Sequence, residues 1–333
     1  MTIKIEPPKR DHITEPEHIK TAYNRNHAPI FDCYLPIHLF GTGSEGNSVF
    51  FKDWNLLIDI GLPMKKYDSW DKNFFSNIDF IILTHIHGDH FNPSTVYHVL
   101  KNYPNINFII TDRMLKDVLD PRFKAVYEPL TDAYGNVIKS FNKNGTPGKP
   151  YYKTDENGEK IIVKSPWLSK FSMYTHRFYV IDSDNIQSLE IPCRNRTLFM
   201  LPCTTKHGDI ENLAIVIYDT VTDEYILYAS DLDNLGGKNS FKDHFGDFLH
   251  ITGLPTEYTF SKMFLEANYD DAILDEWGAR HVDTAGKARV RGSKRHISEK
   301  EAFAFVQKHL ADNGIFIPLH ASKTFGTLLQ YVD

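Results

Sequence analysis

One apolar segment leads directly into a cluster of histidines: residues 80–90 read FIILTHIHGDH. His85 and His87 are two residues apart, so in an extended backbone their side chains lie on the same side. The glycine that follows permits a sharp turn, which brings Asp89 and His90 toward a neighbouring point. Imidazole and carboxylate ligands suit zinc, manganese or iron. Four such ligands from one turn are enough to contribute to two metal ions, so we expect further ligands elsewhere in the chain.

Other apolar strand-like runs end in residues of the same kind. The run from Leu56 ends in Asp59, the run from Tyr225 ends in Asp231, and the run from Ile315 ends in His320. His207 precedes a further apolar run, residues 213–218. Such a pattern is typical of a metal site at one edge of a sheet, with its ligands at several strand ends.

Helix signals lie between these strand-like runs. Asn92 and Pro93 predict a helix start, and Pro104 predicts its end. Ser298 and Glu301 fit a capping box, and we expect Gly314 to stop the helix behind it. Strands and helices therefore mix along the chain, which indicates an α/β sandwich.

Composition divides the chain unevenly. Residues 1–33 are a polar arm, and residues 34–333 are expected to form one catalytic domain. Residues 131–170 interrupt the pattern, because they are rich in Gly, Asn, Pro and Lys, and a loop this long is usually functional or mobile. We expect an insertion there, either a β-hairpin or a solvated surface loop.

The whole chain carries 37 Lys and Arg against 43 Asp and Glu, a net charge of −6. A protein that coats nucleic acid non-specifically is usually basic, so any contact with nucleic acid should be local. Three cysteines make no disulfide framework, and no apolar run approaches the roughly 20 residues that span a bilayer. The polar N-terminus has no apolar signal core. The sequence thus predicts a cytoplasmic protein with no membrane contact.

The order of the candidate ligands resembles a known family. The series His85-x-His87-x-Asp89-His90, then His207, Asp231 and His320, resembles the complete signature of the metallo-β-lactamase fold. The similarity covers roughly residues 34–110 and 200–325. The turn at residues 41–48, the segment 264–270 and the segment 292–298 resemble the YycJ/WalJ-type branch, which is related to ribonuclease Z.

This resemblance implies a four-layer αββα sandwich and metal-dependent hydrolysis of phosphodiesters. The polar arm and an insertion at about residues 115–175 are not part of the usual chain of that branch. They leave the substrate open.

The resemblance also implies two divalent metal ions per chain, zinc or manganese. It gives one ion to His85, His87 and His207, and the other to Asp89, His90 and His320. Asp231 would bridge the two ions. Asp59 and Glu266 would lie behind the ligands and orient them. A homodimer is expected from the resemblance alone.

Hydrolysis of a phosphodiester needs a proton or a positive charge at the leaving oxygen. His296, just before the Ser298 cap, is the candidate acid, with Asp89 as the other catalytic residue. Residues 287–295 hold five cations and no acid, so Lys294 and Arg295 are candidate phosphate contacts or simply a solvated basic loop. Ser44 and Asn47 lie in a glycine-rich turn that either contacts substrate or is only a tight hairpin.

Several functions share these residues. The first is a nuclease acting on DNA or RNA ends. The alternative is a phosphodiesterase for a cyclic nucleotide or cyclic dinucleotide signal, an activity found in some phage-encoded members of this fold. A lactamase, lactonase or glyoxalase lacks a use for the His296 segment. A binding protein without catalysis is disfavoured because no ligand position is lost.

Overall fold

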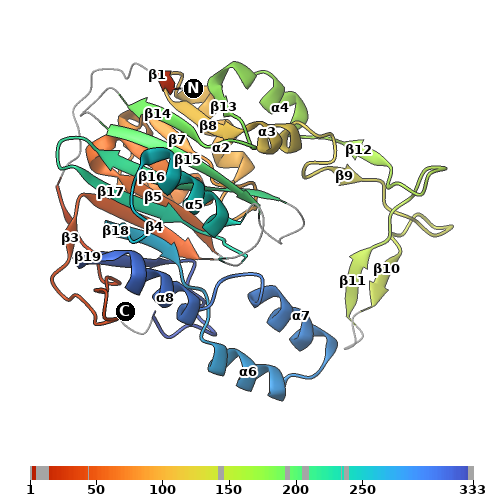
Figure 1. The fold of residues 1–333 in the computed structure, drawn as a ribbon. Coiled ribbons are helices and arrows are strands. Elements are labelled where there is room, and N and C mark those ends of the chain that lie inside the picture. Colours follow the sequence, from red (N-terminus) through yellow and green to blue (C-terminus); the bar gives the residue numbers. More distant parts are fainter. Residues whose placement is uncertain are drawn as a thin grey trace. The chain divides into compact units, whose positions relative to one another are not determined.

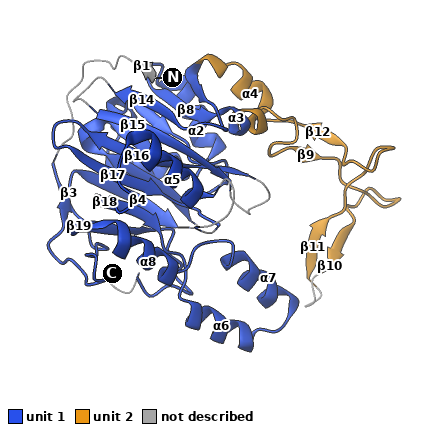
Figure 2. Cartoon of the chain, viewed as in Figure 1, with its two compact units in different colours: residues 1–114, 177–333 blue, residues 115–176 orange. Residues whose placement is uncertain are grey.

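The computed structural model describes residues 2–4, 15–43, 45–141, 146–191, 196–204, 210–233, 235 and 240–328, with the backbone alone for residues 2–4. The chain divides into two compact units, residues 1–114 with 177–333, and residues 115–176 (Figure 2).

The first unit is built on two large sheets (Figure 1). Among the described residues one sheet has seven strands, in the order β1 (Thr2–Lys4), β14 (Gln187–Ile191), β15 (Arg196–Thr204), β16 (Glu211–Asp219), β17 (Glu224–Ala229), β18 (Phe260–Glu266) and β19 (Leu310–Leu319). The other, over the same described ranges, has six, in the order β13 (Phe178–Ile181), β8 (Asn107–Thr111), β7 (Phe80–Ile82), β6 (Leu56–Ile58), β5 (Gly46–Phe51) and β4 (Ile37–Gly43). A small pair, β2 (Glu17–His18) and β3 (Tyr34–Leu35), ties part of the polar arm to the body.

Each sheet contains a run of parallel strands. In the seven-stranded sheet β17, β18 and β19 are parallel. In the six-stranded sheet β6, β7, β8 and β13 are parallel. The carboxyl ends of parallel neighbours meet at the same sheet edge, where ligands of α/β proteins usually bind.

Helices cover the outer faces of the two sheets (Figure 1). The helices of the described residues are α1 (Met64–Trp70), α2 (Pro93–Asn102), α3 (Asp112–Val118), α4 (Leu168–Ser172), α5 (Phe241–Thr252), α6 (Asp271–Arg280), α7 (Thr284–Ser293) and α8 (Glu299–His309). Short 3-10 turns lie at Lys52–Trp54, Phe74–Asn77 and Thr175–Arg177.

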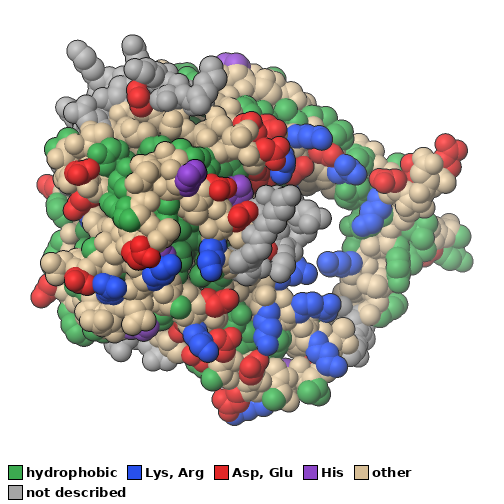
Figure 3. All heavy atoms as spheres, in the orientation of Figure 1, with side chains coloured by type: hydrophobic (Ala, Val, Ile, Leu, Met, Phe, Trp, Pro, Cys, Tyr) green, Lys and Arg blue, Asp and Glu red, His purple; other side chains and the backbone are tan. Residues whose placement is uncertain are grey.

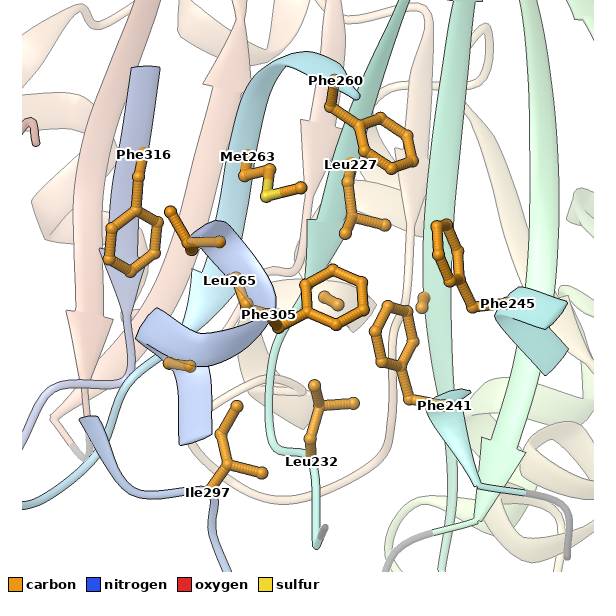
Figure 4. Close-up of a cluster of buried hydrophobic side chains, with 14 of the residues drawn as sticks. Leu227, Leu232, Phe241, Phe245, Phe260, Met263, Leu265, Ile297, Phe305 and Phe316 are labelled. Carbon is orange, nitrogen blue, oxygen red and sulfur yellow. The ribbon is translucent and has the colours of Figure 1, made fainter. Parts of the chain in front are cut away.

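The core of the seven-stranded sheet lies beneath α5 and α8. Phe245 of α5 and Phe305 of α8 meet with ring centroids 5.4 Å apart, over Leu227 and Met263 of the sheet (Figure 4). Burying each of these side chains contributes about 1.5–3 kcal/mol.

Successive side chains along a strand point to opposite faces of the sheet. Phe264, next to Met263, points to the opposite face, where its ring lies 5.2 Å from Phe51 of the six-stranded sheet. Phe50, beside Phe51, points outward and meets Phe74 at 5.1 Å. The two sheets therefore pack face to face with helices outside them, which confirms the αββα sandwich expected from the sequence.

Local expectations mostly agree with the observed elements. Helix α2 begins at Pro93 after an Asn92 cap and ends at Asn102. The capping box of Ser298 and Glu301 opens α8. The expected stop at Gly314 is wrong: α8 ends at His309, because Leu310 already pairs with Phe260 in β19.

In the second unit, residues 115–176, the described residues form two small two-stranded sheets. One pairs β10 (Lys139–Phe141) with β11 (Pro147–Pro150), and the other pairs β9 (Val126–Tyr127) with β12 (Ile162–Lys164). Helix α4 follows, with Trp167 stacked on Phe171 at 5.7 Å.

Candidate metal centre and active site

The candidate ligands of both sheets follow the carboxyl ends of parallel strands. Asp59 follows β6, the histidine turn follows β7, Asp231 follows β17, and His320 follows β19. Three of these residues have left-handed backbones, with φ of 63° at Asp59, 52° at Asp231 and 51° at His320. Left-handed conformations are costly for residues other than glycine and cluster at functional sites. Here they turn the strand ends so that the side chains converge.

Asp231 is the centre of this convergence. Its Oδ2 lies 3.0 Å from His85 Nε2 and 3.3 Å from His90 Nε2. Its Oδ1 lies 3.4 Å from His320 Nε2. Asp89 joins from the other side, with Oδ2 3.4 Å from the same His320 nitrogen. One buried carboxylate is thus shared by donors from both sheets.

Within the described ranges the donors form three overlapping groups, each with its ligand atoms within 4.8 Å of one another. The first is His85, His87 and Asp231; the second is Asp89, His90, Asp231 and His320; the third is Asp231, Glu266, His296 and His320. Two buried polar atoms, His85 Nε2 and Asp231 Oδ1, make no hydrogen bond of acceptable geometry within the described residues. Buried polar atoms are normally satisfied, so these two fit donors to metal. Nitrogen and carboxylate donors of this kind suit divalent zinc or manganese.

The electrostatics of the centre favour positive charge. Burial disfavours a charged imidazole, but Asp231 and Asp59 outweigh it and raise the pKa of His90 to about 10. In the same way burial is outweighed by Asp231, Asp89 and Glu266, which raise the pKa of His320 well above its usual value. Burial would raise the pKa of Asp89, yet the contacts with His320 and His90 lower it to about 2. The carboxylates stay ionised and create a negative site that protons or metal cations neutralise.

Asp59 holds the histidine turn from behind. Its Oδ2 lies 2.7 Å from His90 Nδ1, and its Oδ1 accepts a hydrogen bond of 2.8 Å from Thr84 N. The Thr84 hydroxyl also donates to Asp59 Oδ2 at 2.8 Å and lies 3.2 Å from His85 Nδ1. Such contacts fix the ring orientation of histidine ligands.

Glu266 and His296 form a second buried pair beside the donors. His296 Nδ1 lies 2.6 Å from Glu266 Oε1, and the other Glu266 oxygen accepts a hydrogen bond from Leu232 N at 2.6 Å. Burial alone would raise the pKa of Glu266, but the contact with His296 lowers it. The His296 ring lies over the His320 ring, with centroids 4.7 Å apart. The segment just before α8 therefore places His296 beside the candidate metal ligands.

The remaining expected site residues lie in different places. Asn47 is buried, and its Nδ2 lies 2.7 Å from His90 Nε2, so it contacts a candidate ligand from within the protein. The turn that carries it is the β4–β5 hairpin, with Gly43 opposite Gly46. Lys294 forms an exposed ion pair of 3.0 Å with Asp275, and Arg295 is exposed. His207 and Ser44 lie outside the described residues.

Three further residues support the centre, although the sequence interpretation gave them no role. Thr84 bridges Asp59 and His85, as described above. Asn268 Nδ2 lies 2.9 Å from His320 Nδ1 and donates to the His320 carbonyl at 2.7 Å. Asn212 donates to the Asp231 carbonyl at 3.2 Å. Asn268 stands two residues beyond Glu266, a spacing that would place both side chains on one side of an extended segment.

Two other features bear on the expected character of the chain. Cys33 and Cys203 are buried free thiols, and burial raises the pKa of Cys203 to about 12. In the part of the chain that the structure describes, no helix has the length and apolar character needed to span a bilayer.

Comparison with known proteins gives structural likeness only. No protein-family model and no curated protein matches the chain. Human tRNase Z, short form, is 13% identical with a TM-score of 0.46, over 86% of this chain and 92% of that one. YhfI of Bacillus subtilis, a metallo-β-lactamase-fold protein, is 14% identical with a TM-score of 0.45, over 89% and 90%. Yeast PDE1 is 8% identical with a TM-score of 0.47, over 86% and 97%. The assignment of the site therefore rests on the residues and distances above.

Proposed function

We propose that the chain is a metal-dependent hydrolase of phosphodiesters. The observation that carries this proposal is that Asp231 belongs both to the group with His85 and His87 and to the group with Asp89, His90 and His320, while the Glu266–His296 pair lies directly beside them. A carboxylate common to neighbouring groups is the arrangement expected when two divalent ions occupy one site.

In this proposal His85, His87 and His207 hold one ion, and Asp89, His90 and His320 hold the other. Asp231 serves both. When bound, divalent zinc or manganese polarises phosphoryl oxygens and lowers the pKa of water. Asp59, Thr84 and Asn268 contact the Nδ1 atoms of His90, His85 and His320, so Nε2 is the nitrogen that each ring would offer to an ion.

The protein's own acid in this proposal is His296. Glu266 accepts the hydrogen bond from Nδ1, so Nε2 is the atom that donates the proton to the leaving oxygen. Asp89 remains ionised at neutral pH because its pKa is about 2. It therefore acts as a ligand and holds His320, and does not itself donate a proton.

We infer a nuclease acting on DNA or RNA ends as the substrate class, with a cyclic nucleotide phosphodiesterase as the alternative. Cationic side chains close to His296 support the first, since Lys294 and Arg295 precede it directly. The net charge of −6 fits a small anion and supports the second. Cytoplasmic location and a homodimer stay predictions, the latter to be checked by light scattering.

One competition assay tests the proposal. Protein loaded with Mn²⁺ or Zn²⁺ receives a 5′-phosphorylated single strand together with cyclic mononucleotides and dinucleotides, and the products are separated by chromatography. Shortened oligonucleotide is expected, whereas linearised cyclic nucleotides alone would identify the alternative activity. Asp89→Ala and His87→Ala should lose metal and activity.

His296→Ala separates acid catalysis from metal binding. We expect unchanged metal content and a loss of about 10²–10⁴ in kcat on oligonucleotide, whose leaving oxygen needs a proton. The loss should be much smaller on bis(p-nitrophenyl) phosphate, which has a good leaving group. His98→Ala, an exposed histidine on α2, is the matched control. A full rate of His296→Ala on oligonucleotide would show that the acid role is wrong.

A further inference from the structure

The helical hairpin α6–α7 carries a cavity that the metal centre does not use. Its volume is about 430 Å³, within the range of small-ligand pockets. The lining combines apolar Leu274 and Val290 with Gly278, and adds the charged residues Lys287, Arg291, Lys294 and Asp275. Such a cavity suits a ligand with one flat, weakly polar part and one anionic part.

The hairpin is held to the body from its other face. Arg289 lies over the rings of Trp277 and Phe325, at 5.5 and 5.2 Å from their centroids, and donates to Thr324 Oγ1 at 2.9 Å. On a helix, residues 287 and 291 point about 160° away from residue 289. Arg289 therefore has a structural role, and its cationic neighbours line the cavity.

The side chains that line the cavity carry a net positive charge, even when the ion pair among them is taken as neutral. Asp275 is engaged by Lys294 at 3.0 Å. For Lys287 and Arg291, no carboxylate of the described ranges lies within ion-pair distance, and both side chains are exposed. They are separated by one helical turn, about 6 Å along the axis. Figure 3 shows Lys and Arg side chains gathered on the face where Figure 1 places α7.

This cationic turn lies next to the proposed acid in the chain. Arg291 and His296 are only five positions apart in the chain, so their Cα atoms are at most about 18 Å apart. A polyanion that passes the metal donors beside His296 can therefore reach Lys287 and Arg291 within a few nucleotides.

We propose that the α6–α7 cavity is a nucleotide subsite for single-stranded nucleic acid. Lys287 and Arg291 bind backbone phosphates, and an unpaired base lies against Val290, the partly exposed apolar side chain of the lining. This inference rests on the proposed function and assigns its substrate class. A cyclic mononucleotide has one phosphate, which the metal donors would take, and a paired base cannot enter the cavity.

The test compares two double variants with equal loss of charge. Lys287→Gln with Arg291→Gln removes the subsite cations. Lys101→Gln with Lys308→Gln is the control, since these exposed residues lie in the last turns of α2 and α8, whose first turns are the ends nearer the site. Binding of a fluorescent single-stranded phosphorothioate oligonucleotide to the metal-loaded proteins is followed by anisotropy at several salt concentrations.

The subsite variant should bind about tenfold more weakly near 0.1 M salt, as expected for two exposed charge contacts. Its slope of log K against log salt should fall in magnitude by about 1.4, at about 0.7 per phosphate contact on a single strand. The control should match the unaltered protein, and a duplex of equal length should bind more weakly than the single strand. Equal affinities of the two double variants would overturn the inference, whether or not both bind more weakly than the unaltered protein.

Hydrolysis of bis(p-nitrophenyl) phosphate keeps the two proposals apart. All three proteins should hydrolyse it at rates within about twofold of one another, because the subsite lies outside the metal centre. If none of them hydrolyses any diester, the proposed function fails, while the anisotropy data still decide whether the subsite exists.

Discussion

At the scale of single residues, Glu211 joins the two sheets through a buried carboxylate. It accepts hydrogen bonds from Thr111 Oγ1 at 2.6 Å and from Ser183 Oγ at 2.7 Å. Burial raises the pKa of this group above its ordinary value of 4.5. The folded protein therefore holds this proton at pH values where the unfolded chain has released it. The free energy of unfolding falls as the pH rises through that window.

Glu211→Gln should remove this pH-dependent cost, because the amide oxygen still accepts both hydrogen bonds. We expect the variant to be more stable than the unaltered protein at pH 7, by up to about 1 kcal/mol, with the gain shrinking toward pH 4.5. Thermal unfolding across this pH range measures the difference. Glu156→Gln, an exposed change of the same chemistry, should show no such trend. A stability gain that is constant with pH would contradict the assignment.

Candidate site residues such as Asp59, Asp231 and His320 could be proposed from the sequence because each comes just after an apolar strand. Each of these residues taken alone could be an ordinary cap or a buried polar group, and it is their recurrence at several strand ends that points to a shared site. Thr84 and Asn268 were not assigned, because Thr and Asn are common turn residues and their type alone names no partner. Their role depends on a left-handed turn at Asp59 and on the distance to His320, which only the folded backbone provides.

At the scale of elements, the capping box of α8 positions the proposed acid. Ser298 Oγ accepts from Glu301 N at 3.3 Å, and Glu301 accepts from Ser298 N at 3.0 Å. His296 is two residues earlier, so the first turn of α8 determines where its ring lies.

Ser298→Ala should cost about 1 kcal/mol of stability and should also reduce kcat on oligonucleotide. Ser240→Ala, which removes the N-cap of α5, is the matched control. We expect a similar loss of stability from both variants by denaturant unfolding, but a change in kcat from Ser298→Ala alone. Equal effects on kcat would mean that the cap acts only through general stability.

Helix α7 shows why some elements were missed. Its sequence, TAGKARVRGS, has one large apolar residue, Val290, and no amphipathic period. The helix is stabilised by two tertiary contacts. Val290 packs so closely on Gly278 that a Cβ at position 278 would lie 3.1 Å from Val290 Cγ2. Arg289 lies over two aromatic rings. These tertiary contacts override the local pattern, as the pairing of Leu310 does at the end of α8.

At the scale of the whole molecule, the candidate ligands and the Gly-, Asn-, Pro- and Lys-rich residues 131–170 belong to different units. All described candidate ligands belong to the unit made of residues 1–114 and 177–333. In the other unit, Tyr127 and Ile162 are antiparallel partners, so their backbones are adjacent.

Replacing residues 128–161 by Asn-Gly should close this strand pair with a two-residue turn. We expect the shortened protein to keep its metal content and its rate on bis(p-nitrophenyl) phosphate, while its preference among nucleic acid and cyclic substrates changes. Elemental analysis and the competition assay measure the two outcomes. Loss of metal would show that the segment supports the centre, and an unchanged preference would show that it does not select substrate.

The meeting of Asp89 with His320 also has a consequence for protein synthesis. The two residues are 231 positions apart in the chain. At about 5–20 residues per second, a ribosome needs roughly 10 to 50 s to pass from one to the other. The growing chain therefore carries its histidine turn for most of translation without the last strand that completes the centre. In the proposed hydrolase, His320 therefore joins the other candidate ligands only after β19 has left the ribosome.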